Sequence, residues 1–332
     1  MTSNRKTLIL AKQDVEKLID MPHALQIAEE AFKAQGKGKT QMPAKIYLHL
    51  DKYNGDFRAM PAYIEGMDAC GIKWVNVHPQ NKRYGLPTVM ATIILSDPKT
   101  GFPLAIMDGT HITNVRTGAA GGIAAKYLAR KNSKVVSFVG CGVQAQTQLM
   151  ALYEVFAIDT VLVYDSRRAH ALIFKRKMRH LGLKIRICSN IEGCVKESDI
   201  IVTATPARKP IIKSEWVPSG AHINAIGADA KGKEELEPSL LTRAKVVVDD
   251  LTQAAHSGEI NVPFAQKKLG LKDVYGSLGE IVVGKKKGRT SEKEITIFDS
   301  TGLAILDVAV AHYVYAKAAR RFGRKKLHIR LN

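Results

Sequence analysis

The sequence predicts an α/β protein with two domains: a doubly wound domain around a parallel sheet, and an α+β domain. From about residue 130 to 300, apolar strand-like runs alternate with helical patterns. These strands are almost continuously hydrophobic, which is typical of a parallel sheet covered on both faces. The first third instead contains strand-like runs without helices between them, which indicates a more antiparallel sheet. We expect domains at residues 1–128, joined by a C-terminal helix at 303–332, and at residues 129–302.

The first domain is expected to begin with a helix and continue as strands. Leu25, Ala28 and Phe32 have helical spacing, Asp20 is a plausible N-cap, and Pro22 falls in the first turn. Strand-like runs follow at residues 46–50, 71–77 and 88–95, before a long helix at 113–130 that leads into the second domain.

A glycine-rich turn opens the second domain. An apolar run leads into Gly140-Cys141-Gly142-Val143-Gln144-Ala145 and then a helical pattern over 144–156. In this G-x-G-x-x-G/A pattern Gly140 permits the turn, Gly142 lets the backbone approach a pyrophosphate, and Ala145 allows close helix–strand packing. The N–H groups at the start of the helix attract the anion. The turn therefore predicts a Rossmann-type domain that binds a dinucleotide.

The alternation continues after the turn. The strand at 160–164 ends in Asp165, where a carboxylate hydrogen-bonds ribose hydroxyls and repels a 2′-phosphate, so it favours NAD over NADP. Arg167 and Arg168 follow at once and leave NADP possible. Further strands are expected at 185–187, 200–205, 221–226, 245–248 and 295–298. The expected helices are a basic one that ends at residue 181, one at 191–197 and a last one at 303–320. We expect the last helix to fold back onto the first domain.

Composition narrows the classes of partner. The net charge is +19, with basic runs at 285–289 and 320–326. There is no nucleic-acid recognition motif, so we interpret the runs as a solvated loop and tail whose field attracts anionic ligands. No apolar run could cross a bilayer and no secretory signal is visible, so neither a nucleic-acid nor a membrane partner is expected. The cysteines have no metal-ligand spacing, which predicts free thiols, a cytoplasmic location and no metal site.

Three charged residues could carry chemistry, and each has a structural alternative. Lys73 lies inside an apolar strand pattern, so it is either an edge-strand lysine that reaches solvent or a buried amine with a lowered pKa; periodicity favours the former. Arg116 precedes small residues and could clamp a phosphate or carboxylate, or be an ordinary helix-surface arginine. Asp229 follows a strand, where α/β sheets bind ligands, or is a loop or N-cap aspartate.

Several segments together resemble the ornithine cyclodeaminase/μ-crystallin family, and they cover most of the chain from about residue 40 to 312. They lie at residues 71–79, 85–88, 116–120, 140–145, 223–229 and 299–304. The segments 42–48 and 55–63 look most like the archaeal alanine dehydrogenase branch of that family. Leu306 departs from the pattern, because the family commonly has Gln there.

The resemblance implies a homodimer with the subunit contact in the first domain. It implies that Lys73 is the catalytic lysine and that Asp229 faces it across a cleft. Lys45, Arg58 and Arg116 fall where the family holds the substrate carboxylate and the cofactor phosphates. Four matches lie near the nicotinamide and its ribose: Thr88, Thr203, Lys233 and Ser300. The other matches to cofactor-binding positions are Gly140, Gly142, Val143, Gln144, Asp165, Ser166, Arg167, Gly227, Ala228 and Asp229.

The resulting hypothesis is an NAD-dependent enzyme that converts L-alanine reversibly to pyruvate and ammonium, with an amino acid and a 2-oxo acid as small-molecule partners. Ornithine cyclodeamination, in which NAD is recycled, and ketimine reduction are alternatives within the same fold. A carrier that binds a nicotinamide nucleotide without turnover is the non-enzymatic alternative, but the matched catalytic positions are all present, which argues against it.

Overall fold

The computed structural model describes residues 5–322 and 327–329, and the chain divides into two compact units. Unit 1 comprises residues 1–116 and 303–332, and unit 2 comprises residues 117–302. The boundary lies inside α3 (Thr110–Leu128), not at residue 128 as expected. The reason is close helix packing: a Cβ on Gly118 or Gly121 would collide with Thr147 or Gln148 of α4 (Val143–Val155), so this half of α3 belongs with unit 2.

Unit 1 is built on a largely antiparallel sheet, as expected from the sequence. Its strands lie in the order β18-β1-β7-β6-β5-β4-β2, with β3 paired to β4, and β1 runs parallel to β7. The described strands are β1 (Thr7–Leu10), β2 (Thr40–Gln41), β3 (Ile46–Leu50), β4 (Gly55–Ile64), β5 (Ala69–Val77), β6 (Val89–Ser96), β7 (Pro103–Asp108) and β18 (His328–Ile329).

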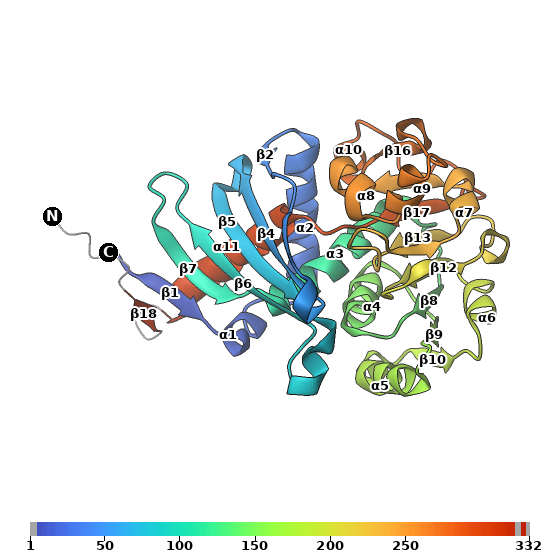
Figure 1. Cartoon of the computed structure of the whole chain (residues 1–332), viewed down its shortest axis with the longest axis horizontal. Coiled ribbons are helices and arrows are strands. Elements are labelled where there is room, and N and C mark those ends of the chain that lie inside the picture. Colours follow the sequence, from blue (N-terminus) through green and yellow to red (C-terminus); the bar gives the residue numbers. More distant parts are fainter. Residues whose placement is uncertain (1–4, 323–326, 330–332) are drawn as a thin grey trace. The chain divides into compact units, whose positions relative to one another are not determined.

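Helices cover one face of this sheet (Figure 1). The unit contains α1 (Lys12–Glu16), α2 (Met21–Gly36) and α11 (Ala304–Phe322). Asp20 caps α2 as predicted, because its side chain accepts a hydrogen bond from the His23 N–H at 3.0 Å. The helix α11 contacts α2, β4, β5 and β6, which confirms that the C-terminal helix folds back onto this unit. The covered face receives Met60, Ile93 and Leu95, all nearly inaccessible.

The opposite face of the same sheet carries exposed apolar side chains. Ile46, Leu48, Trp74 and Ile94 are 66%, 52%, 44% and 38% exposed. Strand register places them together, because Ile46 pairs with Ala59 and Ala59 with Trp74, while Ile94 pairs with Ile72 on the same face. We call this surface the open face.

Unit 2 has the predicted doubly wound architecture. Its strands lie in the order β10-β9-β8-β11-β13-β17-β15-β16, and every neighbouring pair is parallel. They are β8 (Val135–Val139), β9 (Thr160–Tyr164), β10 (Lys184–Ile187), β11 (Ile200–Thr203), β13 (His222–Ala225), β15 (Lys245–Val248), β16 (Val274–Ser277) and β17 (Thr296–Asp299). The order reverses direction between β8 and β11, which is where such sheets bind their ligands.

The remaining elements of unit 2 flank this sheet. The helices are α4, α5 (Arg168–Met178), α6 (Ile191–Val195), α7 (Pro238–Arg243), α8 (Leu251–Ser257), α9 (Asn261–Ala265) and α10 (Leu278–Val282). A small separate sheet joins β12 (Arg208–Ile212) to β14 (Glu234–Leu236). The strand predicted at 200–205 ends at Thr203, and the Thr205 N–H donates to the Glu235 side chain instead of to a neighbouring strand.

Candidate active site

A buried ion-pair cluster lies on the covered face of unit 1. Lys73 is on β5, between β4 and β6, and is 1% exposed, so it is not the edge-strand lysine that periodicity favoured. Its Nζ lies 2.6 Å from Oδ2 of Asp307, which is on α11. The other oxygen of Asp307 accepts a hydrogen bond from Arg116 Nε at 2.9 Å. One inaccessible carboxylate therefore holds both cations.

The surroundings of Lys73 lower the pKa of its amine to about 7. Burial is the largest cause, because it penalises the charged form, and the charges of Arg116 and Lys45 act in the same direction. Asp307 opposes them by stabilising the ammonium form. A lysine with this pKa can exchange a proton near neutral pH, which an ordinary lysine cannot do efficiently.

Arg58 lies on the same sheet face as Lys73. It is 6% exposed, and its guanidinium forms a fork on Asp56, with Nε–Oδ1 at 2.9 Å and Nη2–Oδ2 at 3.1 Å. It also stacks over the ring of Tyr47, whose centroid lies 5.2 Å from Arg58 Cζ. Met60 pairs directly with Lys73, and Arg58 is two positions along the strand, so the two Cα atoms are roughly 7–8 Å apart.

The site in unit 1 carries more positive than negative charge. Lys45, Arg58, Lys73 and Arg116 supply cations, and the aspartates at 56 and 307 supply the anions described above. Such an excess in a poorly solvated place favours a small anion, and guanidinium groups bind carboxylates with fork geometry. Thr88, expected in the cofactor shell, is half-buried just before β6.

Asp307 is the residue that the sequence did not identify. It directly follows Leu306, and Leu306 is 1% exposed among apolar residues of α11, which leaves no polar role for that position. The signal that could have revealed Asp307 is a carboxylate in an otherwise apolar helical stretch, since buried carboxylates require partners.

The glycine turn of unit 2 has the geometry that its motif predicts. Gly140 has φ +93°, and a Cβ there would meet the Ala204 carbonyl oxygen at 2.5 Å, so only glycine fits. Gly142 is the N-cap of α4, and a Cβ on it would meet no atom within 4 Å. Val143 is exposed and Ala145 is fully buried against the strand. The open space at Gly142, at the N-terminus of α4, fits a pyrophosphate.

Asp165 joins the end of β9 to this turn. Its carboxylate accepts hydrogen bonds from the Cys141 N–H and the Arg167 N–H, both at 2.9 Å, and His170 Nδ1 lies 3.3 Å away. Ser166 and Arg167 are exposed beside it. Burial, and then the nearby Asp165, raise the pKa of the Cys141 thiol to about 12, so the helix terminus does not activate this cysteine. All four cysteines are free.

Other predicted cofactor residues gather at the carboxyl ends of β11, β13 and β17. Thr203 is buried at the end of β11, and Ser300 donates its N–H to the Ala225 carbonyl at 3.0 Å. Gly227 and Ala228 follow β13. Asp229 forms an ion pair with Lys233, so the two predicted site residues of this loop lie in contact. The Asp229 side chain is 34% exposed.

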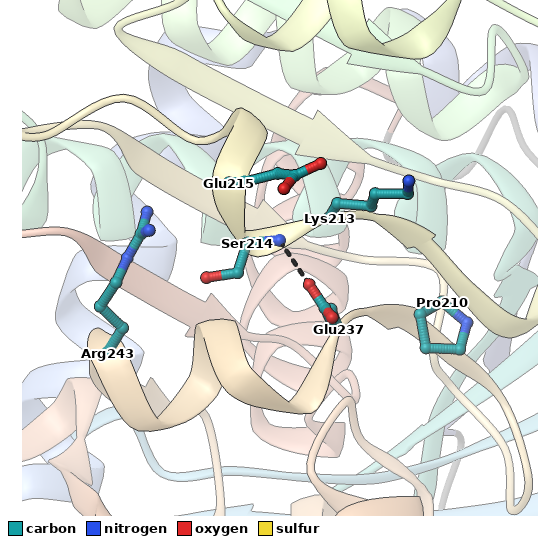
Figure 2. A pocket seen from close by; sticks show the side chains of 6 residues that line it. All are labelled: Pro210, Lys213, Ser214, Glu215, Glu237 and Arg243. Atoms are coloured by element: carbon teal, nitrogen blue, oxygen red, sulfur yellow. Dashed lines mark hydrogen bonds between the residues drawn. The ribbon is translucent and has the colours of Figure 1, made fainter.

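A separate hollow of about 670 Å³ in unit 2 contains none of the predicted residues. Figure 2 shows Lys213, Ser214 and Glu215 on one side of it and Arg243 from α7 on another. Its wall is held by the Ser214 N–H, which donates to Glu237 at 2.7 Å. Across the described residues, no cluster of His, Cys, Asp and Glu could hold a metal ion. Within those residues, no helix has both the length and the apolarity to cross a membrane.

Together, the fold and these clusters define a Rossmann-type dinucleotide-binding protein with a second unit that holds a buried lysine among cations. The ornithine cyclodeaminase/mu-crystallin family model matches residues 5–321, and the chain belongs to this family.

Known relatives match over nearly the whole chain. An alanine dehydrogenase of Archaeoglobus fulgidus is 54% identical over 321 residues, covering 96% of this chain and 98% of the relative. Among solved structures, an archaeal alanine dehydrogenase dimer with bound NAD has a TM-score of 0.95 at 52% identity, covering 99% and 100% of the two chains. A Δ1-pyrroline-2-carboxylate reductase from Thermococcus litoralis, solved with NADH and L-proline, has a TM-score of 0.93 at 40% identity, covering 98% and 100%.

Proposed function

We propose that the protein is an NAD-dependent L-alanine dehydrogenase that converts L-alanine reversibly to pyruvate and ammonium. The observation that carries the proposal is Lys73, a buried amine with a pKa of about 7, held by Asp307 beside Arg116. The similarity to archaeal alanine dehydrogenase over almost the entire chain supports the choice of substrate.

The cofactor in this proposal is NAD, which accepts a hydride when bound. The open space at Gly142 and the tight turn at Gly140 fit its pyrophosphate, and Asp165 presents a carboxylate where a ribose hydroxyl would bind. We assign further contacts with the adenosine half of NAD to Val143, Gln144, Ser166 and Arg167. We assign contacts with the nicotinamide half to Thr88, Thr203, Gly227, Ala228, Lys233 and Ser300. Because Asp165 repels a 2′-phosphate, NAD is preferred over NADP.

The substrate carboxylate is bound by cations of unit 1. We assign this role to Lys45 and Arg58, with Arg116 near the carboxylate or a cofactor phosphate. Asp56 already fixes the plane of the Arg58 guanidinium, so little side-chain entropy is lost when the carboxylate binds.

Lys73 moves the proton. With a pKa of about 7, the Lys73 amine is neutral in roughly half of the protein molecules at neutral pH. In that form it can accept a proton from the substrate ammonium group or from the attacking water. As the hydride leaves Cα, the substrate becomes a cationic imine. We assign to Asp229 the role of orienting the water and stabilising this cation, a charge that develops during the step.

The proposed assembly is a homodimer formed through the open face of unit 1. The open face carries an exposed apolar patch formed by Ile46, Leu48, Trp74 and Ile94. Exposed apolar patches of this kind are typical of a protein–protein interface. A second copy is the proposed partner because the solved archaeal relative is a dimer. A cytoplasmic location completes the proposal and agrees with the free thiols.

Two functions compete with this proposal. The similarity to a pyrroline-carboxylate reductase suggests reduction of a cyclic imine, and the family also includes ornithine cyclodeaminases. Absorbance at 340 nm separates them. Net NADH formation from L-alanine supports the dehydrogenase. Ammonia release from L-ornithine without net NADH supports the cyclodeaminase, and NADH consumption with a cyclic imine supports the reductase.

Replacing Lys73 by Ala tests the proton-transfer role. We expect kcat/KM for alanine to fall by about 10²–10⁴-fold, while the Kd for NADH stays within about twofold of the unaltered protein. The matched control is Lys99→Ala, an exposed lysine in the same unit, which should leave both values unchanged. Turnover by the Lys73 variant close to that of the control would reject the role.

A further inference from the structure

Unit 2 contains a wholly buried carboxylate at its ligand-binding edge that the proposed chemistry does not use. Glu235 lies on β14, outside the main sheet, and is 0% exposed. Its side chain nevertheless reaches the carboxyl ends of β11 and β13, which are neighbours in the main sheet.

Glu235 accepts four hydrogen bonds from these two strand ends. One oxygen binds the Thr203 hydroxyl at 2.8 Å and the Gly227 N–H at 2.9 Å. The other oxygen binds both the N–H and the hydroxyl of Thr205 at 2.7 Å. Because these donors come from two different strands, a single carboxylate fixes the spacing of the loops that follow them.

The same arrangement leaves no freedom at Gly227. A Cβ there would come within 2.6 Å of the Glu235 carboxyl carbon, so the loop backbone lies directly against this side chain. Glu235 also fixes the direction in which the Thr203 hydroxyl donates its hydrogen bond. The proton points to Glu235, which leaves the lone pairs of the hydroxyl oxygen to accept a hydrogen bond from a ligand.

A second buried carboxyl group supports Glu235 from behind. Glu259 accepts the N–H groups of Glu235 and Leu236 at 2.8 and 2.6 Å. Its own N–H donates to Asp299, at the end of β17, at 2.8 Å. Burial, and then the charges of Glu235 and Asp299, raise the pKa of Glu259.

We propose that Glu235 is a positioning residue for the nicotinamide half of the bound cofactor: it holds Thr203 and Gly227 in the geometry that binds the nicotinamide and its ribose. The inference depends on the proposed function in one respect, the assignment of those two residues to the nicotinamide half. Glu235 itself does not touch the cofactor, since its two oxygens are occupied by protein donors.

The test compares NADH with ADP, which keeps the adenosine and both phosphates but lacks the nicotinamide and its ribose, by titration calorimetry on the full-length protein. Glu235→Gln replaces one acceptor oxygen by an NH₂ group that faces protein donors. We expect the Kd for NADH to rise by about tenfold or more, and that for ADP by less than about twofold.

The matched control is Glu234→Gln. Glu234 is the preceding residue on β14 and is also buried, but its Oε1 has no hydrogen-bond partner among the described residues, so neutralising it should change neither Kd. If Glu235→Gln does not fold, as judged by its thermal melt, Thr205→Val removes one of the four hydrogen bonds. We expect it to raise the Kd for NADH by a few-fold, again without affecting that for ADP.

The inference is overturned if both ligands weaken equally in Glu235→Gln or Thr205→Val, because the carboxylate would then maintain the whole unit. It is also overturned if NADH binding matches that of the control. Neither result concerns alanine turnover. A failure of the unaltered protein to bind NADH would instead contradict the cofactor proposed above.

Discussion

Asp307 stabilises the ammonium form of Lys73 against the effect of burial, and removing its charge tests the site directly. In the Asp307→Asn variant, Lys73 and Arg116 lose an anion at 2.6 and 2.9 Å. An opposite charge this close shifts a pKa by about 1–3 units, which corresponds to about 1.4–4 kcal/mol. The Lys73 pKa should therefore fall from about 7 to about 4–6.

The assay is the pH dependence of kcat/KM for alanine oxidation. Lys73 acts in its neutral form, so activity in the unaltered protein rises with pH and reaches half its plateau near pH 7. A lower pKa moves this acidic limb to lower pH. The plateau itself should fall by about 10²-fold, because Lys73 and Arg116 are no longer held in position. The free energy of unfolding should fall by about 3–5 kcal/mol, as is usual when a buried ion pair loses one partner.

The control is Asp97→Asn, which removes a more exposed ion pair with Arg5 in the same unit and should move neither the limb nor the plateau. A variant that loses activity while its acidic limb stays near pH 7 would refute the reasoning. Asp307 would then be a packing residue with little effect on the Lys73 pKa.

Three further predictions concern unit 2. Gly142→Ala should weaken NADH binding by about tenfold or more without changing the melting temperature, because the added Cβ enters space that the cofactor would occupy. Gly140→Ala should weaken NADH binding and also lower the free energy of unfolding by about 1–3 kcal/mol, because φ is +93° there. Asp165→Ser should raise the ratio of kcat/KM for NADP over NAD by about tenfold, and no change in that ratio would exclude the carboxylate as the selectivity element. Cys188, whose pKa is lowered to about 7, chiefly by a hydrogen bond with Cys194, should be alkylated fastest of the cysteines at pH 7.5, as peptide mass spectrometry would show.

The parts of the protein that depend on local sequence could be predicted. The glycine turn needs only a strand, a φ above zero at Gly140 and a helix start, all encoded within a dozen residues. The parallel strands of unit 2 could be located because continuous apolar runs have few other uses. The return of the last helix to unit 1 was also confirmed.

The environment of Lys73 could not be predicted in the same way. Its burial depends on β4 and β6 lying on either side of β5, and no periodicity within β5 encodes its neighbours. Its partner Asp307 lies in a helix at the far end of the chain. Glu235 was missed for a similar reason, because its function is visible only once β11, β13 and β14 have converged.

The chain order of the two units has a consequence for synthesis. Residues 117–302, which carry the glycine turn, form one uninterrupted segment and can fold as soon as they leave the ribosome. Unit 1 cannot be completed at that stage, because α11 is translated after all of unit 2. Until then Lys73 lacks its carboxylate and the covered face of the sheet lacks a helix. A nascent chain released before α11 would therefore present a folded nucleotide-binding unit beside an unfinished and aggregation-prone sheet.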